Sequence, residues 1–171
     1  KMHGSHSANA ELLAGIVAAR PYIADVAVCV PFPYLSETAV ALAASDIRWG
    51  AQDCSAHEQG AYTGEVSATM LAEFGCRYVI VGHSERRAYH AESDQLVADK
   101  AKAALARGVT QLVVLGAGLD TYAYRGAERA KLSVFEIDHP ATQAWKRERL
   151  AEIGVTPDGN VHYAPVDFEN E

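Results

Sequence analysis

The chain has 171 residues, of which 49% are hydrophobic and 22% are charged, and its formal net charge is −7. This composition is typical of a globular protein with one domain or two small ones, and it argues against disorder. No basic stripe is present, so we expect no nucleic-acid partner. No apolar run approaches the roughly 18 residues of a membrane span, so we expect no membrane partner.

The three cysteines are Cys29, Cys54 and Cys76, an odd number at wide spacing without a metal-ligand pattern. Reduced thiols in a cytoplasmic protein are the simplest interpretation. His3 and His6 lie close together but have no cysteine or carboxylate neighbours, and we therefore expect no metal site.

Helix-like and strand-like segments alternate along the chain. Up to Gly108 the predicted elements are a helix at 9–19, a strand at 26–30, a helix at 36–44 capped by Ser36, a strand at 47–51, a helix at 67–74, a strand at 78–81 and a helix at 93–107. After Gly108 they are a strand at 111–115, a short helix near 121, a strand at 133–137, a helix at 140–154 and a strand at 161–166.

This alternation predicts an α/β protein with a parallel sheet of about six strands, built from βα repeats. A sequential, curved sheet is our first expectation and an open doubly wound sheet the second. Residues 1–8 are loop-like, so the strand that should precede the first helix is not found in the sequence.

The first candidate site is the segment 82–87 (GHSERR), directly after a predicted strand. An imidazole at a strand end can polarise a carbonyl group. A histidine bound to the backbone beside a solvated charge cluster explains the same residues equally well.

Several motifs resemble triosephosphate isomerase: KMHGS at the start, PFPYL, WGAQDCSAHEQGAYTGEVSATML and GHSERR, in family order over residues 1–108. The resemblance implies half of a TIM barrel. It also implies that Lys1 steadies the substrate phosphate, that His83 is the electrophile and that Glu85 is the carboxylate beside it. The family's first strand and, after Gly108, its second half with the catalytic base are not recognised in this sequence.

The same resemblance implies self-association. The long loop Gln52–Glu65 matches the family's loop that enters the neighbouring subunit, and Thr63, Glu65 and Arg86 match positions at that contact.

The second candidate site is Gly116-Ala117-Gly118 after the strand 111–115. Glycines at a strand-to-helix turn allow a nucleotide to approach the backbone, although a tight turn alone also requires them. Asp138 follows about twenty residues later, where an acidic side chain can accept ribose hydroxyls, and Asp167 ends the next strand. Either aspartate could equally be a helix N-cap.

Residues 109–171, with VVLGAGLDTYAYR, VFEIDHPATQAWKRERLAEIG and HYAPVDFE, resemble the start of a leucine carboxyl methyltransferase-like, class I S-adenosylmethionine-dependent methyltransferase. The resemblance implies a Rossmann-like βαβαβ fragment. By it, Gly116 and Gly118 face the methionine part of S-adenosylmethionine, Asp138 holds the ribose, and Asp167 with Phe168 borders the adenine.

The change of resemblance between Arg107 and Val109 favours an engineered chimera without the catalytic activity of either parent and with no required cofactor. A natural fusion and a trimmed fragment remain alternatives. Two further functions stay open: weak binding of S-adenosylmethionine through its nucleoside, and a triosephosphate isomerase-type reaction if the missing half is supplied.

Overall fold

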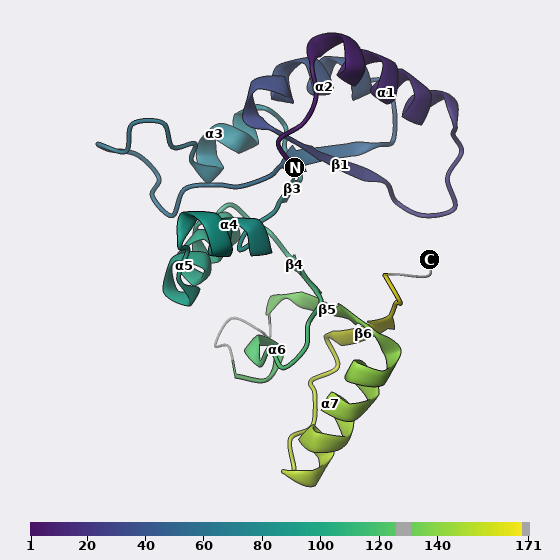
Figure 1. Cartoon of the computed structure of the whole chain (residues 1–171), viewed down its shortest axis with the longest axis vertical. Helices are drawn as coiled ribbons and strands as arrows, with labels where there is room; N and C mark the ends of the chain where they lie inside the picture. The colour runs from purple at the N-terminus through teal and green to yellow at the C-terminus, as the bar shows by residue number, and fades with distance from the viewer. Residues whose placement is uncertain (126–130, 169–171) are drawn as a thin grey trace. The chain divides into compact units, whose positions relative to one another are not determined.

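The computed structural model describes residues 1–125 and 131–168 of the chain. It contains two compact units, Lys1–Gly108 and Val109–Glu171, and each has its own three-stranded parallel sheet (Figure 1). The expected α/β class and parallel pairing are confirmed, whereas the single six-stranded sheet is wrong. The third strand, predicted at 78–81, has only two paired residues, Tyr78 and Val79, so its hydrogen-bond ladder ends early.

The first unit alternates helices and strands in the predicted order. Its elements are α1 (His6–Ala18), β1 (Ala27–Val30), the 3₁₀ turn η1 (Phe32–Tyr34), α2 (Leu35–Leu42), β2 (Arg48–Ala51), α3 (Ala68–Glu73), β3 (Tyr78–Val79), α4 (Ser84–His90) and α5 (Asp94–Leu105). Serine hydroxyls define three helix starts: Ser5, Ser67 and Ser93 each accept a hydrogen bond from the backbone N–H three residues on.

Two local predictions in this unit differ from the structure. Ser36 is not an N-cap, because η1 already turns the chain after Pro31 and α2 begins at Leu35, whose side chain is 2% exposed. Helix α4 was not predicted, because its sequence SERRAYH carries no apolar period that would distinguish it from a solvated loop.

The core of the first unit consists of two clusters on the helix-covered side of the sheet. One contains Leu35, Ala51, Cys54 and Leu71, and the other contains Leu13, Leu42 and Ile47. Helices α1 and α2 lie side by side over the strands (Figure 1). Strand β1 is an edge strand, and an apolar groove of about 280 Å³ runs between it and α1.

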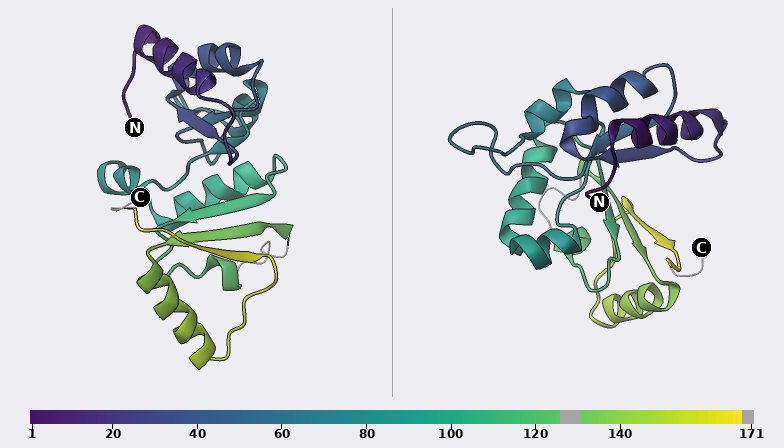
Figure 2. Two further views of the ribbon diagram at one scale, coloured as in Figure 1. Left: turned by 90° about the vertical axis from the view of Figure 1, so that its right-hand side faces the viewer. Right: turned by 45° about the horizontal axis from the view of Figure 1, so that its top comes forward.

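The second unit repeats the pattern with β4 (Gln111–Leu115), α6 (Tyr122–Arg125), β5 (Ser133–Asp138), α7 (Pro140–Glu152) and β6 (Val161–Pro165). Its strands are neighbours in chain order, as Figure 2 shows, with Leu112 paired to Val134 and Val134 paired to Val161. Side chains of α6 and α7 reach Glu136, so both helices cover one face of β5. On β4, Leu115 is 68% exposed.

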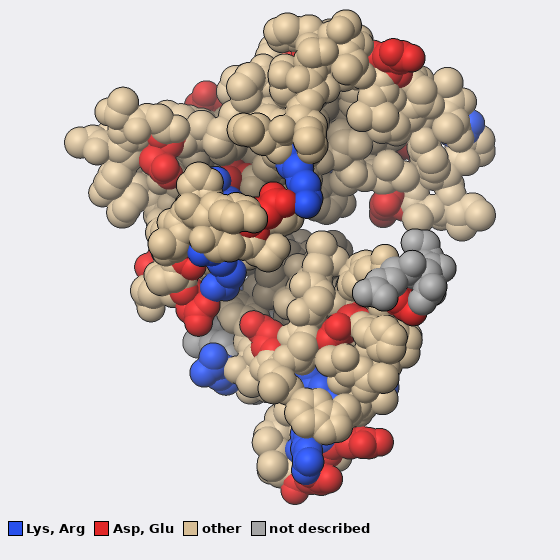
Figure 3. Space-filling view, viewed as in Figure 1, with Lys and Arg blue, Asp and Glu red and all other residues tan. Residues whose placement is uncertain are grey.

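Within the described ranges, no helix has both the length and the apolar character needed to cross a membrane. Those same residues include no group of three or more histidine, cysteine, aspartate or glutamate side chains that could hold a metal ion. On the face shown in Figure 3, acidic and basic side chains are interspersed.

Candidate active site

His83 follows β3 after three residues, 80–82, on the side where the carboxyl ends of the parallel strands lie. The turn that presents it depends on Gly82, whose φ is +67°. A Cβ at Gly82 would lie 2.6 Å from Cγ1 of Val97 on α5, so the backbone can approach that helix only because the residue is glycine. His83 then serves as the N-cap of α4.

The hydrogen bond made by His83 fixes its tautomer. Nδ1 accepts a hydrogen bond of 3.1 Å from the backbone N–H of Glu85. The ring proton therefore resides on Nε2, which becomes a hydrogen-bond donor. Such a donor is the group required to polarise a carbonyl oxygen.

The Lys1 ammonium contacts the Glu85 carboxylate, with 2.6 Å between Nζ and Oε1. The hydrogen bond and the charge of Glu85 raise the pKa of the Lys1 ammonium. The hydrogen bond from Lys1 in turn lowers the pKa of Glu85. The other Glu85 oxygen lies 3.9 Å from His83 Nδ1, so the structure brings all three predicted catalytic side chains together.

Gln52 is a contributor to this site that the sequence did not reveal. Its side-chain amide donates to the Cys29 carbonyl at 3.0 Å and to the Lys1 carbonyl at 3.4 Å. Gln52 follows β2 directly and Cys29 lies near the end of β1. The residue therefore ties the Lys1 backbone to the carboxyl ends of two strands.

A buried ionic cluster is linked to α4 through Arg86, which belongs to that helix. Lys100, 3% exposed, contacts Asp53 at 2.8 Å and Glu92 at 2.6 Å, and Arg86 contacts the same two carboxylates at 2.8 and 2.7 Å. Burial tends to raise the pKa of Glu92, but the hydrogen bonds from Lys100 and Arg86 outweigh it, so this pKa is lowered. Burial likewise opposes the charge of Lys100, yet its partners raise its pKa.

This cluster joins residues up to 47 positions apart, and no local pattern pointed to it. Arg86 was expected at a subunit contact by resemblance. The structure places it in ion pairs within the chain, and its role in a dimer stays a prediction.

The second predicted site is partly assembled in the other unit. Gly116 and Gly118 have φ of +63° and +43°, and the Gly118 N–H donates to Asp138 Oδ2 at 2.7 Å. The other Asp138 oxygen accepts from the His139 N–H at 2.7 Å. Asp138 therefore closes the glycine turn onto the end of β5, and a structural role accounts for these contacts.

The remaining residues of that site are less closely placed. Asp167 Oδ2 lies 3.9 Å from His139 Nε2, and Phe168 is 57% exposed.

A buried polar cluster in the second unit was also missed from the sequence. Glu136, 1% exposed, accepts hydrogen bonds from Lys146 at 2.8 Å and Tyr124 at 3.1 Å, and the Tyr124 hydroxyl also lies 2.8 Å from that of Tyr163. Burial, with the nearby hydroxyl and carboxylate, raises the pKa of Tyr124. The cluster connects α6, α7 and the sheet.

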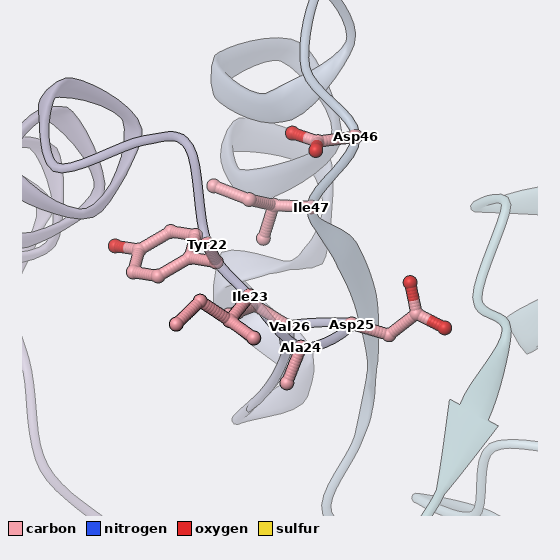
Figure 4. A pocket seen from close by; sticks show the side chains of 7 residues that line it. All are labelled: Tyr22, Ile23, Ala24, Asp25, Val26, Asp46 and Ile47. Atoms are coloured by element: carbon pink, nitrogen blue, oxygen red, sulfur yellow. The ribbon is translucent and has the colours of Figure 1, made fainter.

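A polar pocket of about 230 Å³ lies at the opposite ends of the strands, where β1 and β2 begin (Figure 4). Tyr22, Asp25 and Asp46 are among its lining residues, and Figure 4 shows the Asp25 carboxylate pointing away from the Tyr22 ring. Because chemistry in parallel βα proteins gathers at the carboxyl ends of strands, this pocket is not the candidate site.

Parallel βα repeats with Lys1, His83 and Glu85 at the strand ends define a barrel-type α/β protein with an enzyme-like site. The sequence model of triosephosphate isomerase matches residues 1–147. The chain belongs to the triosephosphate isomerase family.

Individual relatives agree with this assignment. Triosephosphate isomerase of Bordetella pertussis is 64% identical over 120 residues, which cover 70% of this chain and 48% of the relative. That of Cupriavidus necator is 56% identical over 153 residues, covering 90% of this chain and 61% of the relative. The crystal structure of triosephosphate isomerase from Bartonella henselae is similar with a TM-score of 0.71 at 26% identity, covering 98% of this chain and 80% of that one.

These findings correct our expectation of an engineered chimera without parental activity. The family match continues past Gly108, through β4 and β5 and into α7, so it is not confined to the residues where we recognised motifs. The expectation rested on the change of motifs between Arg107 and Val109, and motifs at the ends of buried parallel strands suit several α/β families. The chain spans about half the length of the Bordetella relative. The resemblance of residues 109–171 to a methyltransferase stays a prediction.

Proposed function

We propose that this chain provides the electrophilic part of a triosephosphate isomerase site. The observation that carries the proposal is the Lys1–His83–Glu85 group at the strand ends, where Nδ1 of His83 accepts a backbone hydrogen bond and Nε2 is left as a donor. The match of residues 1–147 to the triosephosphate isomerase family also supports the proposal.

The roles proposed for these side chains follow from the reaction that a triosephosphate isomerase catalyses. Interconverting an aldehyde and a ketone form of a triose phosphate moves a proton between two adjacent carbons through an enediolate. His83 Nε2–H donates to the oxygen that gains negative charge, and the Lys1 ammonium stabilises that charge and the phosphate. Glu85 orients the ammonium through the 2.6 Å contact.

The reaction also needs a base that takes the proton from carbon and returns it to the neighbouring carbon. We assign this base to the part of the family's length that the chain does not span, since it covers 48% of the Bordetella relative. The activity is therefore proposed for the chain together with that complementary part.

The test is a coupled assay in which the chain is mixed with the unmatched part of the Bordetella relative, produced as a separate polypeptide. We expect turnover of glyceraldehyde 3-phosphate that is lost with His83→Ala. His90→Ala is the control, because His90 lies at the other end of α4. A mixture that associates by light scattering but shows no His83-dependent turnover contradicts the proposal.

Self-association through the loop Gln52–Glu65 belongs to the same proposal. The loop extends from the first unit in Figures 1 and 2, and Tyr62 within it is 43% exposed. Such a surface suits burial in a second copy. We also place the protein in the cytoplasm, where its free thiols Cys29, Cys54 and Cys76 remain reduced.

A second candidate function is weak binding of S-adenosylmethionine through its nucleoside at the glycine turn. The observation in its favour is open space: a Cβ at Gly116 would meet no atom within 4 Å, so a ligand can approach the backbone. Asp138 lies at this turn, and each of its oxygens retains a further lone pair for a ribose hydroxyl.

Because the nucleoside contacts carry this binding, adenosine should compete nearly as well as the full cofactor. Asp138→Ala should abolish binding at millimolar ligand, whereas His83→Ala should not affect it. Chemical-shift mapping without changes near Gly116 would show that the turn has only a structural role.

A further inference from the structure

The segment that carries Lys1 is held mainly by side chains from the region just after β1. Residues 1–5 form no helix or strand, and the Lys1 side chain is 62% exposed, so packing does not fix its position. The Tyr34 hydroxyl, from η1, donates to the Gly4 carbonyl at 3.1 Å. The His6 ring meets that of Tyr34 edge to face, with centroids 5.7 Å apart.

Glu37 adds a second attachment from the first turn of α2. One carboxylate oxygen contacts His6 Nδ1 at 2.5 Å, and the other accepts from the Asn9 amide at 3.0 Å. The hydrogen bonds from His6 and then Asn9 lower the pKa of Glu37, which is consistent with an ionised acceptor. Asn9 also lies against Gly4, where a Cβ would come within 2.5 Å of Oδ1.

These attachments matter because the contact between Tyr34 and the Gly4 carbonyl lies close to Lys1 along the chain. Two residues separate Lys1 from Gly4, and a chain spans about 3.3 Å per residue at most, so the Gly4 contact holds the backbone within roughly 10 Å of Lys1. In the structure the Lys1 ammonium lies 2.6 Å from the Glu85 carboxylate. Gln52 alone, at 3.4 Å from the Lys1 carbonyl, is a weak restraint.

We propose that Tyr34 and Glu37 are positioning residues, which hold the segment 1–9 at the end of β1 so that the Lys1 ammonium reaches Glu85 and the reacting group. Their contacts are with Gly4, His6 and Asn9, so they act through the segment and not on the reacting group. The catalytic meaning of this role rests on the proposed isomerase function, but the positioning itself is measurable without turnover.

The experiment titrates the Lys1 ammonium and the Glu85 carboxylate by NMR in Tyr34→Phe, Glu37→Ala and the double variant. In the parent chain the pKa of Lys1 is raised and that of Glu85 is lowered by their contact. We expect both to return toward ordinary values, most fully in the double variant. The other groups near the pair, His83, Tyr89 and the α-amino group, are unchanged by these substitutions.

Tyr22→Phe is the matched control. The Tyr22 hydroxyl donates to the Ile16 carbonyl at 2.7 Å, so this variant loses the same kind of hydrogen bond at the far end of α1. It should leave both titrations as in the parent. Glu37→Gln retains an acceptor for Asn9 and should recover part of the parent behaviour.

Unchanged titrations in the double variant, with a parental circular dichroism spectrum, overturn the proposal. If the double variant does not fold, the single variants decide by the same criterion. In the complemented isomerase assay, the single variants should lower kcat/KM by about 10-fold or more, because small displacements of a catalytic group are costly. If the variants shift the titrations of Lys1 and Glu85 but the complemented assay shows no turnover for the parent chain, the isomerase function is refuted and the positioning role stands.

Discussion

Removing the buried ammonium of Lys100 should destabilise the first unit strongly. In Lys100→Met the aliphatic volume is retained, but of the two described cations that contact Asp53 and Glu92, Arg86 alone remains. Both carboxylates are buried, at 7% and 6% exposed. Leaving a buried charge uncompensated costs about 3–5 kcal/mol. We expect a loss of this size in the free energy of unfolding.

Urea unfolding followed by tryptophan fluorescence measures this loss. Trp49 belongs to the unit that contains Lys100 and Trp145 to the other, so a Trp145→Phe background makes the signal specific. With a urea dependence of about 1–3 kcal/mol per molar, the midpoint should fall by at least about 1 M.

Lys102→Met is the control on the same helix. Its ion pair with Asp99 is 2.9 Å long, but the side chains are 68% and 41% exposed, so the loss should be below about 0.5 kcal/mol. Adding Glu92→Gln to Lys100→Met should restore at least about 1 kcal/mol, since one uncompensated charge disappears. Equal losses for Lys100→Met and Lys102→Met would refute the reasoning.

Three further predictions concern the same unit. Gly82→Ala should lower the free energy of unfolding by about 1–3 kcal/mol, because φ is +67° and the new Cβ meets Val97. In urea unfolding, adding Val97→Ala should recover only the part of this loss that comes from the steric contact. Burial raises the pKa of the Cys54 thiol to about 11, so at pH 8 its thiolate fraction is about a thousandth. Alkylation of Cys54, followed by mass spectrometry, should therefore be at least about 100-fold slower than that of a model thiol, and its rate should increase with pH. If the loop Gln52–Glu65 mediates self-association, light scattering at tens of micromolar should give at least twice the 18.4 kDa of one chain, and a monomer counts against it.

Local patterns predicted most of the elements but not how they are connected in space. Ser93 could be recognised as a cap from the sequence, and apolar β-branched runs marked β1 and β4. The division into two sheets was not visible, because a two-residue strand such as Tyr78–Val79 differs from a longer one only in its pairing. Helix α4 was missed because its start depends on the His83 side chain and on the ion pair of Arg86 with Asp53, which is distant in the sequence.

The candidate site shows the same limit. Lys1, His83 and Glu85 were predicted from family motifs, and their contacts are present in the structure. Gln52 and Tyr34 carried no signal of their own, because each acts on a backbone carbonyl far along the chain. The chimera without parental activity was a wrong inference from the change of motifs between Arg107 and Val109, because the family match continues across that junction to residue 147.

The loop Gln52–Glu65 is already ordered by its own contacts, and this has a consequence for any surface that receives it. The Ser55 N–H donates to the Val66 carbonyl at 2.8 Å, and the His57 and Tyr62 rings stack with centroids 3.8 Å apart. Ordering a flexible backbone costs about 1–2 kcal/mol per residue. A free peptide of this sequence, lacking the fixed ends, must meet that cost on binding, whereas the intact loop has met most of it during folding. If a second copy of the chain receives this loop, the preorganised loop should bind it far more tightly than the free peptide does.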